Sequence, residues 1–239
     1  MDKSNIIITG TSSGLGLGLA SYYLKKGFNV YGFSRRNSIE LEKHSNYFHF
    51  KVDLTDSYAT KLAIENILQT ISNIDLLILN AGILGDIDIM SNTIMNDAKH
   101  VMDINLWANK RLIDLILNSE MSCKQIVAIS SGASQNGSAG WGAYSISKAA
   151  LNMLIKTYAV ENKDVHFSSI APGLVDTAMQ DYISNFKNED NFDAITRIQN
   201  ARGTDAMPSA KQIAEPLANM IDKLYSKETS GEYFDIRKY

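Results

Sequence analysis

The chain has 239 residues, of which 45% are hydrophobic, and its formal net charge is −3 at pH 7. This length and apolar content suffice for one large core, and the charge gives no reason to expect nucleic acid as a partner. No apolar run approaches the length of a membrane span and the N-terminus lacks a signal-peptide pattern, so no membrane association is expected.

The single cysteine, Cys123, excludes an internal disulfide and fits a reducing, cytoplasmic location. The four histidines have no metal-ligand spacing with this cysteine, so no metal site is predicted. The sequence contains no internal repeat, low-complexity tract or proline-rich linker. We therefore expect one domain over residues 1–239.

A glycine-rich segment follows the first predicted strand, Asn5–Thr9. Gly10, Gly14 and Gly16 are spaced as T-G-x-x-x-G-x-G, directly before a helix predicted to end at Lys26. Glycines at such a corner allow a tight turn, and the helix N-terminus offers free N–H groups to a pyrophosphate. This pattern predicts a dinucleotide site, and a glycine-rich turn without a ligand is the alternative.

The second predicted strand, Phe28–Phe33, ends at Ser34, Arg35 and Arg36. Arg35 lies nineteen residues after Gly16, about where such a fold reads the adenosine ribose. An acidic residue there would bind the ribose hydroxyls, whereas a guanidinium pairs with a 2′-phosphate. The sequence therefore predicts a preference for NADPH, and solvated loop arginines are the alternative, chiefly for Arg36.

The remaining chain continues the alternation of strands and helices. Further strands are predicted at residues 47–52, 74–79, 125–129, 165–170 and 232–236, and helices at about 56–71, 96–118 and from about 143 onward. The nearly continuous apolar run at 74–79 is typical of a parallel strand buried on both faces. Together these elements predict a single-domain α/β Rossmann fold, a doubly wound seven-stranded parallel sheet with helices on both faces.

Residues from about 179 to 205 form a polar segment between the sixth strand and the last helix. Its scattered apolar residues are Tyr182, Ile183, Phe186, Phe192 and Ile195. This segment is predicted to be a substrate lid, and a pair of plain surface helices is the alternative.

The stretch from Ser131 to Lys148 carries the clearest chemistry. Tyr144 and Lys148 are four residues apart and share one face of the predicted helix. A free phenol has a pKa of about 10, which a neighbouring ammonium lowers toward the working range. Ser131, at the mouth of the preceding strand, can hydrogen-bond the oxygen that Tyr144 protonates. The sequence therefore predicts proton transfer at a carbonyl or an alcohol.

The same Tyr-x-x-x-Lys spacing occurs at two other places. Tyr22 and Lys26 lie on the first helix, with no strand-borne serine before them. Tyr47 and Lys51 alternate with other residues as in a strand, where four residues span roughly 13 Å and the side chains cannot touch. Only the pair ending at Lys148 combines a helix, a glycine-rich loop and a serine thirteen residues before the tyrosine.

These motifs and their order resemble the classical short-chain dehydrogenase/reductase family. The resemblance implies that Tyr144 is the catalytic acid/base, Lys148 its activator and a ribose ligand, and Ser131 the orienter of the substrate oxygen. It also implies that Asn105 maintains a proton-relay water beside the lysine, with a helix-kink asparagine as the structural alternative. A homodimer or homotetramer, formed through the helices bearing Asn105 and Tyr144, is implied by the family alone.

The resemblance extends to the cofactor contacts. Asp53 would contact the adenine amino group, with a cap of the next helix as its alternative role. Asn80-Ala81-Gly82 matches the family's N-A-G motif, although this chain has Leu79 where the family usually has a second asparagine. In the P-G-x-x-x-T motif, Val175 and Thr177 would hold the carboxamide or the phosphates. The predicted cofactor set is Gly10, Ser12, Ser13, Gly14, Leu15, Gly16, Ser34, Arg35, Arg36, Asp53, Leu54, Asn80, Ala81, Gly82, Tyr144, Lys148, Pro172, Gly173, Val175 and Thr177.

Two short segments, P-G-L-V-D-T-A-M-Q and G-E-Y-F-D-I-R, resemble the sepiapterin reductase and benzil reductase branch. That branch implies a vicinal dicarbonyl or a pterin side-chain ketone as substrate. The predicted substrate contacts, which suit a flat or aromatic ketone, are Ser131, Ala133, Trp141, Tyr144, Leu174 and Tyr182. The rival hypotheses are a 3-oxoacyl-thioester reductase and a non-catalytic NADP-sensing regulator, although all four catalytic positions are kept.

Overall fold

Seven parallel strands form one sheet in the order β3-β2-β1-β4-β5-β6-β7. The computed structural model describes residues 4–189 and 192–239. The strands are β1 Asn5–Thr9, β2 Asn29–Ser34, β3 Tyr47–Lys51, β4 Asn73–Leu79, β5 Ser122–Ile129, β6 His166–Ala171 and β7 Tyr233–Asp235. The predicted doubly wound parallel sheet is confirmed. Strand order reverses between β1 and β4, and ligands of such folds bind at the carboxyl ends of strands near this switch point.

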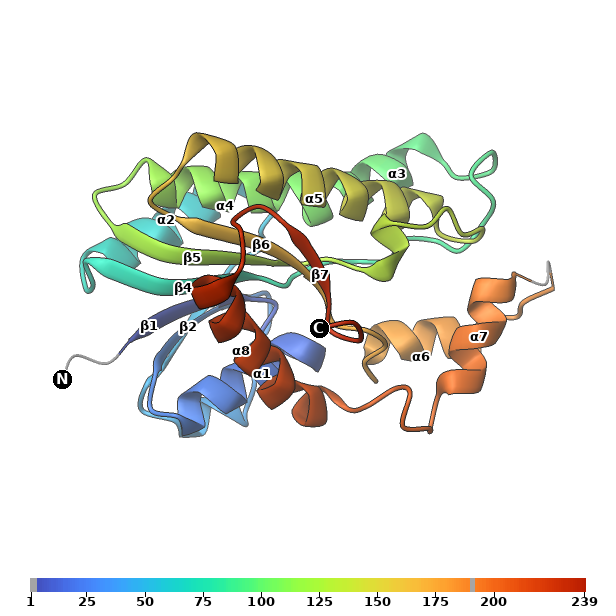
Figure 1. Cartoon of the computed structure of the whole chain (residues 1–239), viewed down its shortest axis with the longest axis horizontal. Coiled ribbons are helices and arrows are strands. Elements are labelled where there is room, and N and C mark those ends of the chain that lie inside the picture. Colours follow the sequence, from blue (N-terminus) through green and yellow to red (C-terminus); the bar gives the residue numbers. More distant parts are fainter. Residues whose placement is uncertain (1–3, 190–191) are drawn as a thin grey trace.

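Helices cover both faces of the sheet (Figure 1). The helices α1 Gly14–Lys25 and α8 Ala210–Lys227 pack on one face, and α2 Ser57–Leu68, α4 Ala108–Leu117 and α5 Gly142–Glu161 cover the other. Side chains of β1 alternate between the two layers, because Ile6 and Ile8 pack with α1 and α8 whereas Ile7 packs with the opposite layer. β1 is therefore buried on both sides.

The helix predicted over 96–118 is not continuous. It consists of α3 Met95–Met102, a π-helical turn Asp103–Trp107 and α4. Asn105, inside the turn, donates from Nδ2 to the Ile83 carbonyl and to Ser147 Oγ at 2.8 and 2.9 Å, and its Oδ1 accepts from the Ile83 N–H at 2.8 Å. Its own carbonyl accepts from the Asn109 side chain at 2.8 Å. These bonds stabilise the irregular turn, so the kink expected as the structural alternative for Asn105 is observed.

The helices α6 Ala178–Asn185 and α7 Asp193–Ala201 lie beyond the carboxyl ends of the strands (Figure 1). They fall within the predicted lid, of which residues 190–191 lie outside the described residues. Their buried Ile183, Ile195 and Ile198 form an apolar cluster with Trp141 and Leu84, separate from the two layers of the core. The segment therefore packs as a unit over one end of the sheet.

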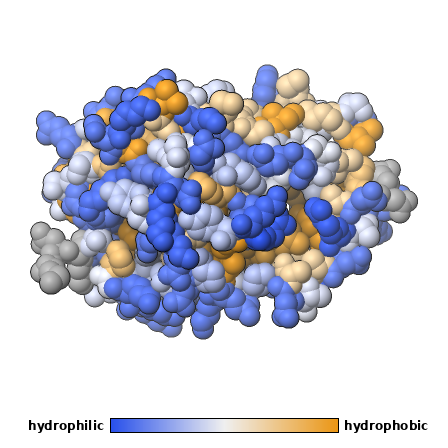
Figure 2. All heavy atoms as spheres, viewed as in Figure 1, coloured by the Kyte–Doolittle hydropathy of each residue, from blue (hydrophilic) through white to orange (hydrophobic). Residues whose placement is uncertain are grey.

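The face of the molecule in Figure 2 is largely hydrophilic, with hydrophobic residues visible mainly between the polar ones. Within residues 4–189 and 192–239, every helix is too short or too polar to span a bilayer.

Candidate active site

A cleft of about 480 Å³ lies at the carboxyl ends of the strands, bounded by the glycine-rich loop on one side and by α6 and α7 on the other. Three of the predicted site residues do not line it, namely Gly16, Asn105 and Tyr182. All the others do, so the fold brings together residues predicted from seven separate stretches of the sequence.

Tyr144, Lys148 and Ser131 meet in this cleft. Because Tyr144 and Lys148 are one turn apart on α5, the ammonium of Lys148 lies 5.8 Å from the centre of the Tyr144 ring. The same ammonium donates to the Ile129 carbonyl, at the end of β5, at 2.8 Å. Ser131 is the second residue after β5; its hydroxyl accepts from the Ala133 N–H at 3.1 Å and interacts with the Tyr144 phenol. The three side chains thus form the arrangement that the spacing predicts.

The electrostatics of this group differ from the expectation that Lys148 lowers the pKa of Tyr144. Desolvation raises the pKa of Tyr144, against the smaller opposing effect of its hydrogen bond with Ser131. Burial also lowers the pKa of Lys148, to about 8. Both shifts have the same cause, because a group removed from water is less stable in its charged form. The protein therefore holds a protonated phenol next to a lysine whose charged form is destabilised by burial.

The two other Tyr-x-x-x-Lys pairs lie outside the cleft. Lys26 is 5.4 Å from the ring centre of Tyr22, nearly the geometry of the pair on α5, but the lysine is exposed to solvent. Tyr47 and Lys51 are the first and last residues of β3, as predicted. Spacing alone therefore does not distinguish a reactive pair, whereas position relative to the cleft does.

Asn105 lies behind the cleft rather than in it, and it is fully buried. A Cβ atom added to Gly82 would lie 3.1 Å from Asn105 Oδ1 and 3.4 Å from Lys148 Nζ. The absence of a side chain at Gly82 therefore lets the loop after β4 pack against both groups. Through Ser147, Asn105 also fixes this loop to α5. The relay water remains a prediction.

The glycine-rich loop has the geometry that a pyrophosphate requires. A Cβ atom on Gly16 would lie 2.2 Å from the carbonyl oxygen of Gly10, so Gly16 acts by letting α1 approach the loop. In the described part of the chain, the Ser13 side chain caps no N–H of α1, and the first turn of the helix faces the cleft. Free N–H groups and the helix dipole make this turn a site for an anion. The residues present therefore fit the phosphates of a dinucleotide.

Arg35 and Arg36 are exposed and line the opposite end of the cleft from α6. Neither forms an ion pair with a carboxylate among the residues that the structure describes. The Ser34 hydroxyl is already engaged, since it donates to the Arg36 carbonyl at 2.7 Å and contacts His49 Nε2 at 3.0 Å. Ser34 thus shapes the loop that presents two unpaired guanidinium groups.

Asp53 also lines this end of the cleft, and its pKa is lowered mainly by hydrogen bonds from the backbone and the hydroxyl of Thr55. Its alternative role as a helix cap is wrong. The cap of α2 is Asp56, whose Oδ1 accepts from the N–H groups of Tyr58 and Ala59, both at 3.0 Å. Asp53 therefore stays free to contact a ligand.

At the other end, Ala133, Trp141 and Leu174 line the cleft as predicted, but Tyr182 does not. Tyr182 is 45% exposed, on the outer side of α6, and the next residue, Ile183, is buried and lines the cleft instead. The prediction for Tyr182 fails because the sequence does not fix which face of α6 turns inward.

The sequence did not reveal two polar residues of this end, Gln180 and Arg237. Gln180 is 9% exposed, and within the described residues its Oε1 has no hydrogen-bond partner. A buried polar atom without a partner is costly, so a donor on a bound ligand would be favourable there. The sequence feature near Gln180 is the predicted P-G-x-x-x-T motif, whose Thr177 lies three residues before it. Arg237 is the last residue of the G-E-Y-F-D-I-R segment that resembles the benzil reductase branch, but the segment does not show that this side chain reaches the cleft.

Comparison with known proteins agrees with this site. Residues 4–188 match the family profile described as short chain dehydrogenase. Benzil reductase ((S)-benzoin forming) of Bacillus subtilis is 31% identical over 245 residues, which cover 98% of each chain. The 3-oxoacyl-acyl-carrier-protein reductase FabG of Rickettsia bellii is 31% identical over 240 residues, 94% of this chain and 90% of the relative.

Among solved structures, the YIR035C short chain dehydrogenase/reductase of Saccharomyces cerevisiae superposes with a TM-score of 0.86. The two sequences are 26% identical, and the match covers 98% of this chain and 96% of the yeast protein. Fold, site and sequence lead to one assignment, and the chain belongs to the short chain dehydrogenase family of oxidoreductases.

Proposed function

We propose that the protein is an NADPH-dependent reductase that converts a ketone, with a vicinal dicarbonyl as the favoured class, to an alcohol. The observation that carries the proposal is the meeting of Ser131, Tyr144 and Lys148 in a cleft whose far end presents Arg35. The apolar walls near Trp141 suit a flat substrate. The likeness to a benzil reductase over nearly the whole chain supports the dicarbonyl class.

In the proposed mechanism, the glycine-rich loop and Arg35 would hold NADPH in the cleft, where it would supply the hydride for the carbonyl carbon. The Ser131 hydroxyl donates to the substrate oxygen, and Tyr144 gives this oxygen a proton as negative charge develops on it. The raised pKa of Tyr144 suits this direction, because the phenol stays protonated near neutral pH. Lys148, fixed by the Ile129 carbonyl, holds its ammonium beside the phenol and stabilises charge that develops there.

Substituting Arg35 by alanine is expected to lower kcat/KM for NADPH about 30-fold and to leave kcat/KM for NADH within about threefold, because only NADPH carries the 2′-phosphate. Initial rates with both cofactors measure this change. Arg36→Ala is the matched control, with an expected loss for NADPH below about fivefold. Equal catalytic efficiency of the unchanged protein with NADH and NADPH would contradict the cofactor assignment.

The proposed reaction is tested by following NADPH oxidation with a panel of carbonyl compounds. The panel holds a vicinal diketone, a pterin side-chain ketone, a 3-oxoacyl thioester and simple aldehydes. Turnover of the diketone or the pterin supports the proposal. If the protein binds NADPH but reduces no compound of the panel, the result would favour the hypothesis of a non-catalytic NADP-sensing regulator.

A 3-oxoacyl-thioester reductase is the second candidate, because the FabG relative is as similar in sequence as the benzil reductase is. The two candidates share every catalytic residue and differ only in the substrate end of the cleft. Turnover restricted to the thioester would select this candidate and leave Ser131, Tyr144 and Lys148 in their roles.

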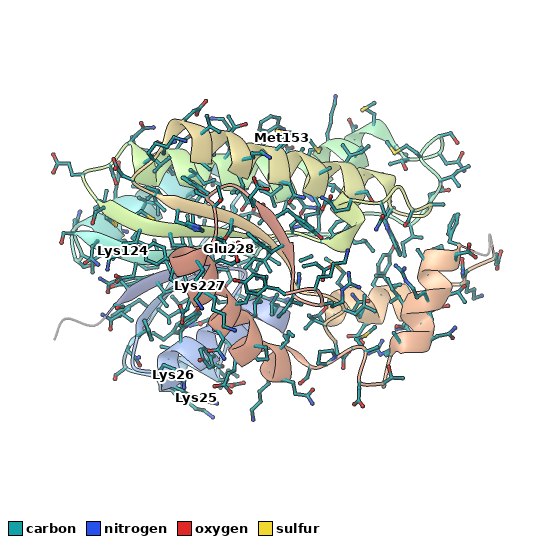
Figure 3. The ribbon with its side chains drawn as sticks, in the orientation of Figure 1. Lys25, Lys26, Lys124, Met153, Lys227 and Glu228 are labelled. Carbon is teal, nitrogen blue, oxygen red and sulfur yellow. The ribbon has the colours of Figure 1, made fainter. Side chains whose placement is uncertain are left out.

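We also propose that two copies of the chain associate through the outer face of α5. Ile146, Met153 and Val160 are spaced seven residues apart and are 51%, 63% and 65% exposed, and Trp107 on the adjoining turn is 48% exposed. Met153 lies on the side of α5 that faces away from the sheet (Figure 3). Residues at this spacing share one helix face, and such a contiguous apolar surface is typical of an interface.

Met153→Glu is expected to convert the assembled protein to a monomer at micromolar concentration, because it places a charge in the middle of this face. Light scattering coupled to size exclusion measures the mass. Leu62→Glu is the control, since Leu62 is an exposed apolar residue on α2, outside this face. A monomeric unchanged protein, or an unchanged mass in the Met153 variant, would be incompatible with this interface.

A further inference from the structure

Arg237, two residues after β7, is held in one orientation by Asp235. The backbone N–H and Nε of Arg237 donate to Asp235 Oδ1 at 3.0 and 2.9 Å, and Nη2 donates to Oδ2 at 2.5 Å. Asp235 is 8% exposed, and the hydrogen bonds from the Arg237 side chain are the largest cause of its lowered pKa. The carboxylate is thus fixed in the protein and in turn fixes the plane of the guanidinium.

The pairing leaves one edge of the guanidinium available. A guanidinium has five N–H donors, and the bidentate bond to Asp235 uses the edge formed by Nε and Nη2. For the edge formed by Nη1 and Nη2, the described residues provide no acceptor. Two parallel donors on such an edge match the two oxygens of a carboxylate.

This guanidinium lies next to the catalytic serine. A Cβ atom added to Gly132, the residue after Ser131, would be 3.3 Å from Arg237 Nη2. On the other side, a Cβ atom on Gly173 would be 3.5 Å from Arg237 Cδ. Arg237 lines the same cleft as Ser131 and Tyr144. A group bound to its open edge would therefore be close to the carbonyl that these residues hold.

The charge around the cleft is asymmetric. Asp53, at the adenosine end, is the only carboxylate among the described residues that line the cleft. The substrate end instead carries Arg237 and Arg197, and Arg197 forms no ion pair within the described residues. Asp235 offsets the charge of Arg237 but leaves its outer donors in place. An anionic substrate would find free donors at this end, where the Asp235 carboxylate is bonded to the other edge of the Arg237 guanidinium.

We propose that the substrate is a carbonyl compound with a carboxylate adjacent to the reacting ketone, and that Arg237 binds this carboxylate. The inference rests on the proposed ketone reduction and adds the charge of the substrate to it. Arg237 is then a specificity-determining residue, distinct from the three residues that carry out the proton transfer.

The test compares phenylglyoxylate with its methyl ester, which present the same ketone with and without a negative charge. The unchanged protein is expected to reduce phenylglyoxylate with the higher kcat/KM. Arg237→Met should lower this value about 30-fold and change kcat/KM for the ester by less than about threefold. Lys238→Met is the matched control, because it removes one positive charge from the neighbouring exposed residue, which does not line the cleft.

Equal losses for both substrates, or weaker NADPH binding in a fluorescence titration, would assign Arg237 to the fold or to the cofactor and overturn the proposal. A preference of the unchanged protein for the ester would also overturn it. If neither compound is reduced, the proposed reaction is wrong. Calorimetry of phenylglyoxylate binding to the NADPH-loaded protein then tests separately whether Arg237 binds a carboxylate. Binding that is lost in Arg237→Met and kept in Lys238→Met supports the site, and equal binding by both variants rejects it.

Discussion

Replacing Tyr144 by phenylalanine is expected to lower kcat for ketone reduction by at least about 10³-fold and to change NADPH affinity by less than about threefold. The substitution removes the phenol that interacts with the Ser131 side chain, and it keeps the ring that lies beside the Lys148 ammonium. The proton must then come from water rather than from a side chain held beside the substrate oxygen. The effect should therefore fall on the chemical step rather than on cofactor binding.

Single-turnover rates and a fluorescence titration with NADPH separate these two effects. Tyr22→Phe is the matched control, because Tyr22 has the same spacing and nearly the same distance to a lysine but lies outside the cleft. Full activity is expected for that variant. If Tyr144→Phe kept more than about a tenth of the activity, another group would be the proton donor and the mechanism would be wrong.

The sequence predicts the sheet and the arrangement of Ser131, Tyr144 and Lys148 well because both depend on local patterns in a fixed chain order. Apolar runs mark the strands, and the spacing from Ser131 to Tyr144 and Lys148 places all three at the end of β5 and the start of α5. These features need no knowledge of distant contacts. The same holds for Arg35, which follows directly from the end of β2.

The failures concern properties that arise only from packing. Whether Tyr182 or Ile183 faces the cleft depends on the rotation of α6, which its apolar cluster sets. The π-helical turn depends on Asn105 bonds to residues 22 and 42 positions away. The pKa of Tyr144 depends on burial, which raises it and outweighs the opposing hydrogen bond with Ser131.

Arg237 illustrates a further limit. Its pairing with Asp235 is local in sequence, but its position beside Gly132 follows from the addition of β7 to the sheet edge next to β6. A short strand near the C-terminus gives no sign of which side chain reaches the cleft. Residues that determine substrate preference are therefore less predictable here than residues that perform the reaction.

The burial of Lys148 lowers the stability of the folded protein. Lys148 is 3% exposed, and the Ile129 carbonyl is its only hydrogen-bond acceptor among the described residues. Its pKa falls from 10.5 to about 8, a difference that corresponds to roughly 3 kcal/mol against folding at pH 7. Such a penalty is typical of a functional site, where a charge is kept because the reaction needs it.

Lys148→Met is therefore expected to raise the free energy of unfolding by about 2 kcal/mol at pH 7, and Tm by roughly 5 °C, while kcat/KM falls at least about 10²-fold. The gain is smaller than the full penalty because the Ile129 carbonyl loses its donor, at a cost of about 1 kcal/mol. Thermal unfolding of both proteins at several pH values measures the difference.

The sign of the pH dependence provides the sharper test. The pKa of Lys148 is lower in the folded protein than in the unfolded chain, so between about pH 8 and 10.5 the unfolded chain binds more protons than the folded protein does. The unchanged protein therefore becomes more stable as pH rises through this range. The advantage of Lys148→Met should thus be largest below pH 8 and should shrink as pH approaches 10.5. Lys26→Met, which removes an exposed lysine, should show no such trend. A variant less stable than the unchanged protein at pH 7, or an advantage independent of pH, would show that Lys148 does not carry a buried charge.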